Sequence, residues 1–253
     1  MRGKVSGSNQ RGYAPISYLQ KAGETMSFYN KYRPHQFADV LGQEQVVTIL
    51  KKQALTGQYH HAYLLFGASG TGKTTTARIL AMCLNCYSLN GDGEPCGECQ
   101  SCEAIRKGSH WDVIEIDGAR FRGIDDVKEL AYRAYLSPLG NKKVYIIDEC
   151  HMLTEPAWNG MLKLLEEPPP HLVIIMATTH FEKIPDTITS RCQLYPFEKL
   201  KPNHIKQKLE HISQSIGITP DPKHIQFIVE SAHGNMRSAE NILEQVCQLK
   251  ETK

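Results

Sequence analysis

Residues 62–74 read Ala-Tyr-Leu-Leu-Phe-Gly-Ala-Ser-Gly-Thr-Gly-Lys-Thr, an apolar run followed by a glycine-rich turn and a Lys-Thr pair. The apolar run is typical of a buried parallel strand. Apolar residues at helical spacing follow it, at Ala77, Leu80, Ala81 and Leu84. The turn matches the pattern G-x-x-x-x-G-K-[ST], whose backbone N–H groups point inward at phosphate oxygens. A plain surface turn needs neither the Lys-Thr pair nor the flanking elements, so the segment predicts a nucleoside-triphosphate cradle.

The cradle defines the first set of candidate ligand-binding residues. Lys73 is expected to reach the β- and γ-phosphates, and the Thr74 hydroxyl is expected to bind Mg²⁺. The dipole of the following helix adds to phosphate binding. The set is Gly67, Ala68, Ser69, Gly70, Thr71, Gly72, Lys73 and Thr74.

Composition places the chain among globular proteins. Its 253 residues are 41% hydrophobic, enough for one larger and one smaller domain. The net charge is only +2, so contact with nucleic acid would have to be local. No apolar stretch is long enough to cross a bilayer, and we expect no membrane association.

The first 25 residues are rich in Gly, Ser, Lys and Arg and lack the apolar core of a secretory signal. We interpret residues 1–25 as a disordered basic extension or as a wrongly assigned start, with Met26 the functional beginning. An organelle-targeting segment is a further alternative. Without a secretory signal, the eight cysteines indicate a reducing compartment, and we expect a cytoplasmic protein.

Strand patterns recur along the first two hundred residues, with helical patterns between them. They lie at 62–66, 113–116, 144–147, 172–177 and, more briefly, 194–197. This alternation predicts an α/β fold in which helices flank a parallel sheet and the ligand lies at the carboxyl ends of the strands.

Beyond Lys199 the strand signal ends and three helical faces follow. They are Ile205, Leu209, Ile212 and Ile216; Ile225, Ile228, Val229 and Ala232; and Ala239, Ile242, Leu243 and Val246. We therefore predict a core domain over 26–198 and a small three-helix lid domain over 199–253, with a hinge at 198–202 before the first helix.

The strand pattern at 144–147 delivers Asp148 and Glu149 to its carboxyl end. A Walker B element must lie there. Asp148 is predicted to hold Mg²⁺ through water, and Glu149 to orient and polarise the attacking water.

Four further residues leave functional and structural interpretations open. Thr178 and Thr179 follow an apolar strand and either sense the γ-phosphate or cap the strand end. Arg191 either stabilises charge on a transferring phosphoryl group or forms a surface ion pair. Arg237 has the same two interpretations.

Four cysteines, at Cys86, Cys96, Cys99 and Cys102, are spaced C-x9-C-x2-C-x2-C among glycines and prolines. Four thiolates close a tetrahedral site, so we predict a structural Zn²⁺ in an insertion at 86–102. An iron–sulfur cluster and a redox switch are the alternatives. The other four cysteines are interpreted as buried thiols.

These motifs together resemble one family, that of the bacterial DNA polymerase III gamma/tau clamp-loader subunits. The resemblance runs from about Met26 to the C-terminus. The cysteine insertion between the cradle and the Walker B element is its most specific mark. The segments that carry it are Tyr32-Arg33-Pro34 with Phe37, Asp39-Val40 and Gly42-Gln43, the GxxxxGKT cradle, the four cysteines, Asp148-Glu149-Cys150-His151, Ser190-Arg191-Cys192 and Gly234-Asn235-Met236-Arg237.

The resemblance implies a P-loop AAA+ core and gives further residues a role. Arg33 and Pro34, together with 46–47, would approach the adenine of ATP. Thr178 would lie in sensor 1. Arg191 would act in trans on the ATP of a neighbouring subunit, and Arg237 would act as sensor 2 on the ATP of its own chain.

The resemblance also implies a function. Such a protein would be an ATPase that couples ATP binding and hydrolysis to loading of the sliding clamp on primer-template DNA. It would work with ATP, Mg²⁺ and Zn²⁺ in a hetero-oligomeric ring with other clamp-loader subunits, contacting the DNA backbone. The chain carries no polymerase active site of its own.

Three departures from the family pattern accompany the resemblance. The collar domain that assembles the ring would be missing after Lys253, which would impair assembly. Ser238 stands where an acid usually follows the sensor 2 arginine, and residues 117–122 are not the usual small, polar pattern. The alternative functions are a nucleotide-binding scaffold with little hydrolysis of its own and a sequence-specific zinc DNA-binding protein; the absence of a recognition-helix pattern and the low net charge argue against the latter.

Overall fold

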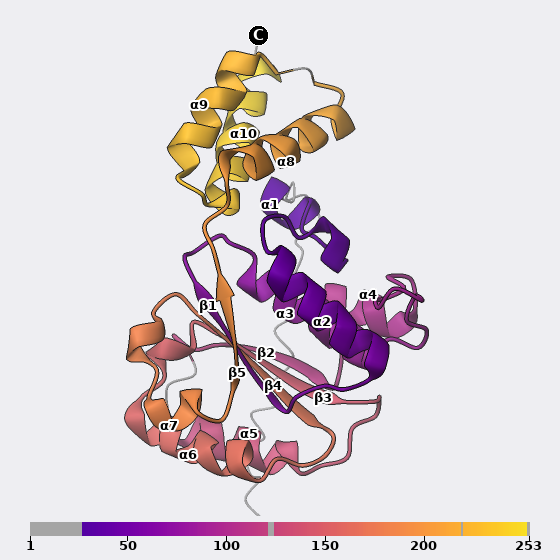
Figure 1. Ribbon diagram of the computed structural model, residues 1–253, viewed down its shortest axis with the longest axis vertical. Helices are drawn as coiled ribbons and strands as arrows, with labels where there is room; N and C mark the ends of the chain where they lie inside the picture. The colour runs from indigo at the N-terminus through magenta and orange to yellow at the C-terminus, as the bar shows by residue number, and fades with distance from the viewer. Residues whose placement is uncertain (1–26, 121–123, 219, 252–253) are drawn as a thin grey trace, which may run out of the picture.

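Five parallel strands in the spatial order β2-β3-β4-β1-β5 form the central sheet of the computed structural model, which describes residues 27–120, 124–218 and 220–251 (Figure 1). The prediction of five strands is confirmed. Each observed strand extends one residue beyond its predicted range at one end or at both ends. The prediction for residues 1–25 lies outside the described residues. The strands are β1 (Ala62–Gly67), β2 (Val113–Asp117), β3 (Lys143–Asp148), β4 (Leu172–Thr178) and β5 (Gln193–Phe197).

Helices cover both faces of the sheet. Two separate hydrophobic clusters lie on its two faces. The first face carries α2 (Glu44–Thr56), α3 (Lys73–Asn85), α4 (Gln100–Arg106) and the 3₁₀ turn η1 (Phe37–Asp39). The second carries α5 (Ile124–Ala134), α6 (Glu155–Glu166), α7 (Asp186–Thr189) and the turns η2 (Cys150–Met152) and η3 (Phe181–Lys183).

Burial explains the different sequence patterns of the strands. Every residue of β4, in the middle of the sheet, is buried, so this strand is apolar throughout. At the edge, β5 alternates: Tyr195 and Phe197 are buried, whereas Leu194 and Pro196 are exposed. Pro196 is tolerated because an edge strand leaves its outer side unpaired. The short pattern seen at 194–197 is therefore the signature of an edge position.

The last three helices form a separate small bundle. They are α8 (Pro202–Ser215), α9 (Pro222–Ala232) and α10 (Met236–Glu251), and their apolar faces meet in a third cluster. The predicted three-helix lid is confirmed. The short helix α1 (Phe28–Lys31) also packs here, because Phe28 and Tyr32 contact the lid cluster. The division of the chain at residue 198 stays a prediction.

Two contacts tie the lid and its linker to the glycine-rich loop. The backbone N–H of Met236, at the start of α10, donates to the Gly70 carbonyl over 3.0 Å. The side-chain amide of Gln43 donates to the Glu198 carbonyl over 2.8 Å and to the Thr71 carbonyl over 3.3 Å. The Glu198 N–H donates back to Gln43 Oε1 over 3.1 Å. The loop is therefore held between the sheet and the lid.

Strand order brings the functional segments to one edge of the sheet. Because all strands are parallel, the loops after β1, β3 and β4 leave from the same end. Phe66 of β1 pairs with Thr178 of β4, and β4 lies between β1 and β3.

No helix in the described ranges is both long and apolar enough to span a bilayer.

Replacing a buried leucine of the central sheet should destabilise the fold strongly. Leu64 in β1 is fully buried, so Leu64→Ala leaves a cavity and should lower the free energy of unfolding by about 2–5 kcal/mol. The matched control is Leu139→Ala, because Leu139 is 83% exposed and should change it by less than about 0.5 kcal/mol. Urea denaturation followed by circular dichroism measures both, and equal effects would contradict the packing described above.

Candidate nucleotide-binding site

A cavity lies between the glycine-rich loop, the segment after α1 and the lid. Its empty volume, including the part open to solvent, is about 860 Å³. The loop residues Ser69, Gly70, Thr71, Gly72, Lys73 and Thr74 line it together with Asp148 and Glu149, and so do Arg33, Pro34 and Arg237. Most of the residues predicted from the sequence to bind nucleotide thus lie around one space.

Lys73, the first residue of α3, points into the loop that precedes it. Its Nζ donates to the carbonyls of Gly67 and Ala68, each over 2.8 Å. Burial lowers the pKa of Lys73, while the nearby carboxylates of Glu149 and Asp148 oppose that shift. Gly67 and Ala68 therefore do not line the cavity. Their carbonyls accept hydrogen bonds from the Lys73 amine and so hold it against the loop.

Gly70 shows why the loop needs glycine. Its φ is +71°, and a Cβ there would collide with the side-chain amide of Asn235 from the lid. Asn235 Oδ1 accepts from the N–H of Ser238, which caps the first turn of α10. A side chain at position 70 would therefore displace the Asn235 cap and would also require a strained positive φ.

Thr74 and Asp148 meet at the carboxyl end of β3. Thr74 Oγ1 donates to Asp148 Oδ2 over 2.9 Å. Burial raises the pKa of Asp148, and the Thr74 hydrogen bond opposes this. The pair offers a hydroxyl oxygen and a carboxylate oxygen side by side, and oxygen ligands are those that Mg²⁺ takes in proteins.

Glu149 has a left-handed backbone conformation, with φ of 46°. Its Oε2 accepts hydrogen bonds from the N–H of Thr179 over 3.2 Å and from its hydroxyl over 2.9 Å. His151 Nδ1 lies 3.3 Å from the same oxygen. Glu149 lines the cavity, but its carboxylate is hydrogen-bonded to Thr179, the residue directly after β4.

Besides Gly67 and Ala68, the predicted site residues Thr178 and Arg191 do not line this cavity. Thr178 is fully buried, and its hydroxyl contacts His151 Nδ1 at 3.1 Å and accepts from the N–H of His180 at 3.0 Å. Arg191 follows α7, where its Nη2 donates to Glu166 Oε1 over 2.6 Å. The structure thus separates Arg191 from the cavity of its own chain, and the roles assigned to both residues stay predictions.

The lid side of the cavity contains a stacked arrangement of Tyr29 with two arginines. The guanidinium carbon of Arg33 lies 4.6 Å from the centre of the Tyr29 ring, and that of Arg237 lies 4.1 Å from it. Arg237 also donates a hydrogen bond to the Tyr29 hydroxyl. Arg237 is therefore held within the cavity wall by α1.

The segment at 46–47 does not line the cavity, since Val46 is buried in the core.

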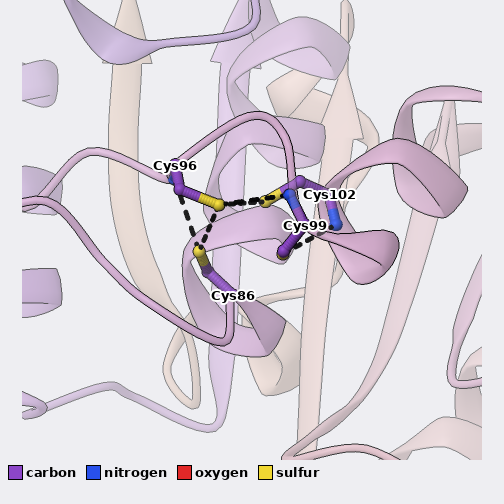
Figure 2. A group of neighbouring side chains, drawn as sticks. All are labelled: Cys86, Cys96, Cys99 and Cys102. Carbon is purple, nitrogen blue, oxygen red and sulfur yellow. Dashed lines mark hydrogen bonds between the residues drawn. The ribbon is translucent and has the colours of Figure 1, made fainter.

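The four cysteines converge at the junction of α3 and α4 (Figure 2). All four sulfurs lie within 4.8 Å of one another, and Cys86 Sγ lies 3.4 Å from Cys96 Sγ. In a tetrahedral Zn–S₄ site, with bonds of about 2.3 Å, sulfurs are about 3.8 Å apart, so the set fits one ion. Backbone N–H groups of Cys96, Cys99 and Cys102 donate to neighbouring sulfurs over 3.3 to 3.4 Å.

Glu94 connects the cysteine insertion with the cavity wall. This buried carboxylate accepts from the backbone N–H of Phe37 over 2.7 Å and of Ala38 over 2.9 Å, and Lys51 Nζ lies 3.0 Å from it. Phe37 and Ala38 belong to the turn that leads to Asp39 and Val40, which line the cavity. The insertion therefore holds the N-terminal side of the cavity in place.

Sequence reasoning missed several residues at or around this site. Among them, Gln43 joins the linker to the loop, Tyr29 contacts both arginines through its ring, and Glu240 of α10 lines the cavity. Gln43 lies in a segment quoted for its family resemblance, without a role. Glu240 could have been noticed in the sequence, because an acidic residue at this position interrupts the apolar helix face made by Ala239, Ile242 and Leu243.

The family model described as "DNA polymerase III, delta subunit" matches residues 42–201. Similar proteins include the DNA polymerase III subunit gamma/tau of Mycoplasma pneumoniae, 42% identical over 89% of this chain and 33% of its own length. The subunit tau of Bacillus subtilis is 41% identical over 87% of this chain and 39% of its own length. The subunit tau of Escherichia coli is 42% identical over 85% of this chain and 33% of its own length. The chain thus spans only about a third of the length of these relatives.

Solved structures support the fold assignment. The Thermotoga maritima RuvB Holliday junction branch migration motor superimposes with a TM-score of 0.63 at 18% identity, over 85% of this chain and 65% of that one. The chain therefore shares the fold of this motor protein. From the match of the family model over residues 42–201, the chain belongs to the DNA polymerase III delta-subunit family, and it is similar over most of its length to subunits named gamma, tau or gamma/tau.

Proposed function

We propose that this chain is the ATP-binding and ATP-hydrolysing subunit of a replicative clamp loader. The observation that carries the proposal is the meeting of Lys73, Thr74, Asp148 and Glu149 around one cavity beneath a lid. A cation for phosphate, a pair of oxygen ligands for a metal ion and a carboxylate base are the parts that phosphoryl transfer requires.

The loop residues would bind the triphosphate. The backbone N–H groups of the segment from Ser69 to Thr74 form the cradle, and the N-terminus of α3 adds its dipole. Lys73 Nζ, now bonded to two loop carbonyls, would turn to the β- and γ-phosphate oxygens. The adjacent turn of α10 would then cover the phosphates, because Met236 is already bonded to Gly70.

The Thr74 and Asp148 oxygens fit Mg²⁺. When bound, Mg²⁺ would neutralise negative charge that develops on the phosphate oxygens. The Thr74 hydroxyl would donate its hydrogen bond elsewhere and offer a lone pair, while Asp148 would act as a carboxylate through water. The Asp148 pKa, raised by burial, would fall beside a cation, so the ionised form is favoured when the site is filled.

Glu149 would orient and polarise the attacking water. Its Oε2 is bonded to the backbone and side chain of Thr179, which fixes the orientation of the carboxylate, and Oε1 would be the oxygen that accepts a hydrogen bond from the water. Arg191 would act on the ATP of a neighbouring subunit, since it does not line the cavity of its own chain. To do so, the Arg191 guanidinium would leave its ion pair with Glu166 and bind a phosphoryl oxygen of that ATP.

The proposed partners are other clamp-loader subunits, the sliding clamp and the backbone of primer-template DNA. The names of the relatives, as subunits of DNA polymerase III, support assembly with further subunits. ATP binding would close the lid on the core and order the ring, and hydrolysis would release it. The cysteine set fits a structural Zn²⁺, which would brace the insertion that carries Glu94.

Removing the Lys73 amine should abolish nucleotide binding. Lys73→Ala takes away the cation that reaches the phosphates, and we expect the affinity for ATP to fall by at least about a hundredfold, the loss of one desolvated charged contact. Equilibrium dialysis with Mg²⁺ and ATP measures this. Lys163→Ala, which alters an exposed lysine of α6, is the control and should bind as the unmodified chain does. Unchanged binding by Lys73→Ala would contradict the assignment of the cradle.

Removing the Arg191 guanidinium should leave binding intact and slow hydrolysis in the assembled ring. An arginine supplied in trans contributes about 10³–10⁵ in rate, so Arg191→Ala should reduce steady-state ATPase by at least about 10³-fold. The assay uses the protein with other clamp-loader subunits, the clamp and primed DNA.

Arg133→Ala, which breaks the surface ion pair with Glu129, is the control for that assay and should hydrolyse ATP normally. Equal loss of binding in Arg191→Ala and Lys73→Ala would show that the trans assignment is wrong. No stimulation of the unmodified chain by any combination of these partners would favour the nucleotide-binding scaffold over the ATPase.

The cysteine set should hold one zinc ion per chain. Elemental analysis of the purified protein should give one zinc and no iron, and Cys99→Ser should lower the zinc content because one of four thiolates is lost. Cys192→Ser, outside the set, should keep full zinc. Full zinc in Cys99→Ser would defeat the four-thiolate site, and iron in place of zinc would favour the cluster alternative.

A further inference from the structure

Glu240 is a buried acid without a partner in the wall of the cavity. It lies on α10, is 3% exposed and lines the cavity. Among the residues that the structure describes, no donor lies within hydrogen-bonding distance of its carboxyl group. Burial raises the pKa of Glu240 to about 7, although the charges of Lys208, Arg33 and Arg237 oppose the shift. An unpaired buried carboxyl is unfavourable, so the site suits a ligand that supplies a donor.

The lid helix sets the position of Glu240 relative to the phosphate loop. Met236 N–H is bonded to the Gly70 carbonyl, so the first turn of α10 lies against the loop. Glu240 comes four residues later on the same helix, which places it about 6 Å further along the helix axis. The carboxyl group therefore lies beyond the phosphate end of the cavity, on the side where α1 and α8 meet α10.

The same cavity has apolar walls suited to a flat ring. Pro34, Val40, Leu41 and Leu200 line it. Lys208 Nζ donates to the Tyr32 carbonyl over 2.8 Å, which joins α8 to the segment that carries Pro34. Apolar walls with a few convergent polar groups are typical of sites in which those groups orient the ligand and provide specificity.

We propose that Glu240 is the residue that recognises the base, accepting a hydrogen bond from the exocyclic amino group of a purine. This inference rests on the proposed nucleotide-binding function, which makes the purine adenine. Phosphates carry no donor, so they do not satisfy Glu240, whereas an amino group on the ring presents an N–H in the plane of the base. Glu240 would then determine specificity, while Lys73 and the loop provide most of the affinity.

The test removes the two halves of the proposed contact separately. Dissociation constants are measured with Mg²⁺ for ATP and for purine riboside triphosphate, which lacks the amino group, using the unmodified chain and Glu240→Leu. We expect the unmodified chain to bind ATP about tenfold more tightly than the analogue, the value of one charge-assisted hydrogen bond. Glu240→Leu should bind both with the affinity that the unmodified chain has for the analogue.

Further variants and ligands make the result specific. Glu240→Gln keeps an acceptor oxygen and should retain most of the preference for ATP. Glu230→Leu replaces an exposed acid of the same lid and should leave every affinity unchanged. 2′-Deoxy-ATP keeps the amino group, so its affinity should fall in Glu240→Leu as much as that of ATP.

Distinct outcomes overturn the inference and the function. If the unmodified chain binds ATP and Glu240→Leu keeps the tenfold preference for it over the analogue, Glu240 does not contact the amino group. If the effect of Glu240→Leu disappears with 2′-deoxy-ATP, the carboxyl group contacts the ribose instead. A preference of the unmodified chain for GTP would overturn the assignment to adenine. If the unmodified chain binds none of these triphosphates, the proposed function itself fails.

Discussion

The hydrogen bond between the Thr74 hydroxyl and the Asp148 carboxylate is the contact on which the account depends. It joins the first turn of α3 to the end of β3, across the strand β4 that separates β1 from β3. Because β1 and β3 run in the same direction, their carboxyl ends lie at the same edge of the sheet, and the contact depends on this arrangement of the α/β core. The phosphate cradle, the metal ligands and Glu149 all take their positions from this edge.

Two peripheral segments complete the cavity that the sheet begins. The lid meets the loop through Met236 and Gly70, and the positive φ of Gly70 together with the nearby Asn235 side chain favours glycine at position 70. The cysteine insertion reaches the opposite wall through Glu94, which holds the backbone of Phe37 and Ala38. A structural ion at the cysteines would therefore support the ligand site indirectly, through the position of this turn. Both segments make contacts between residues far apart in the sequence.

Local patterns predicted most of the fold and the phosphate end of the site. The five strands, the cradle, the Asp148-Glu149 pair and the cysteine set each lie within a short stretch whose spacing reflects its structure. Tyr29, Gln43 and Glu240 escaped prediction because their contacts depend on how α1, the linker and α10 pack together. The hydrogen bonds of Glu149 to Thr179 and the ion pair of Arg191 with Glu166 likewise arise from tertiary structure. Hydrophobic periodicity carries no information about such pairs.

A crystal structure with Mg²⁺ and a non-hydrolysable ATP analogue would locate the triphosphate and the metal ion. We expect the triphosphate along the segment from Ser69 to Thr74, with Lys73 Nζ released from the Gly67 and Ala68 carbonyls and within hydrogen-bonding distance of a phosphate oxygen. Mg²⁺ should lie beside Thr74 Oγ1 and the Asp148 carboxylate. An analogue bound elsewhere, or a Lys73 amine still bonded to the loop beneath a bound triphosphate, would contradict this expectation.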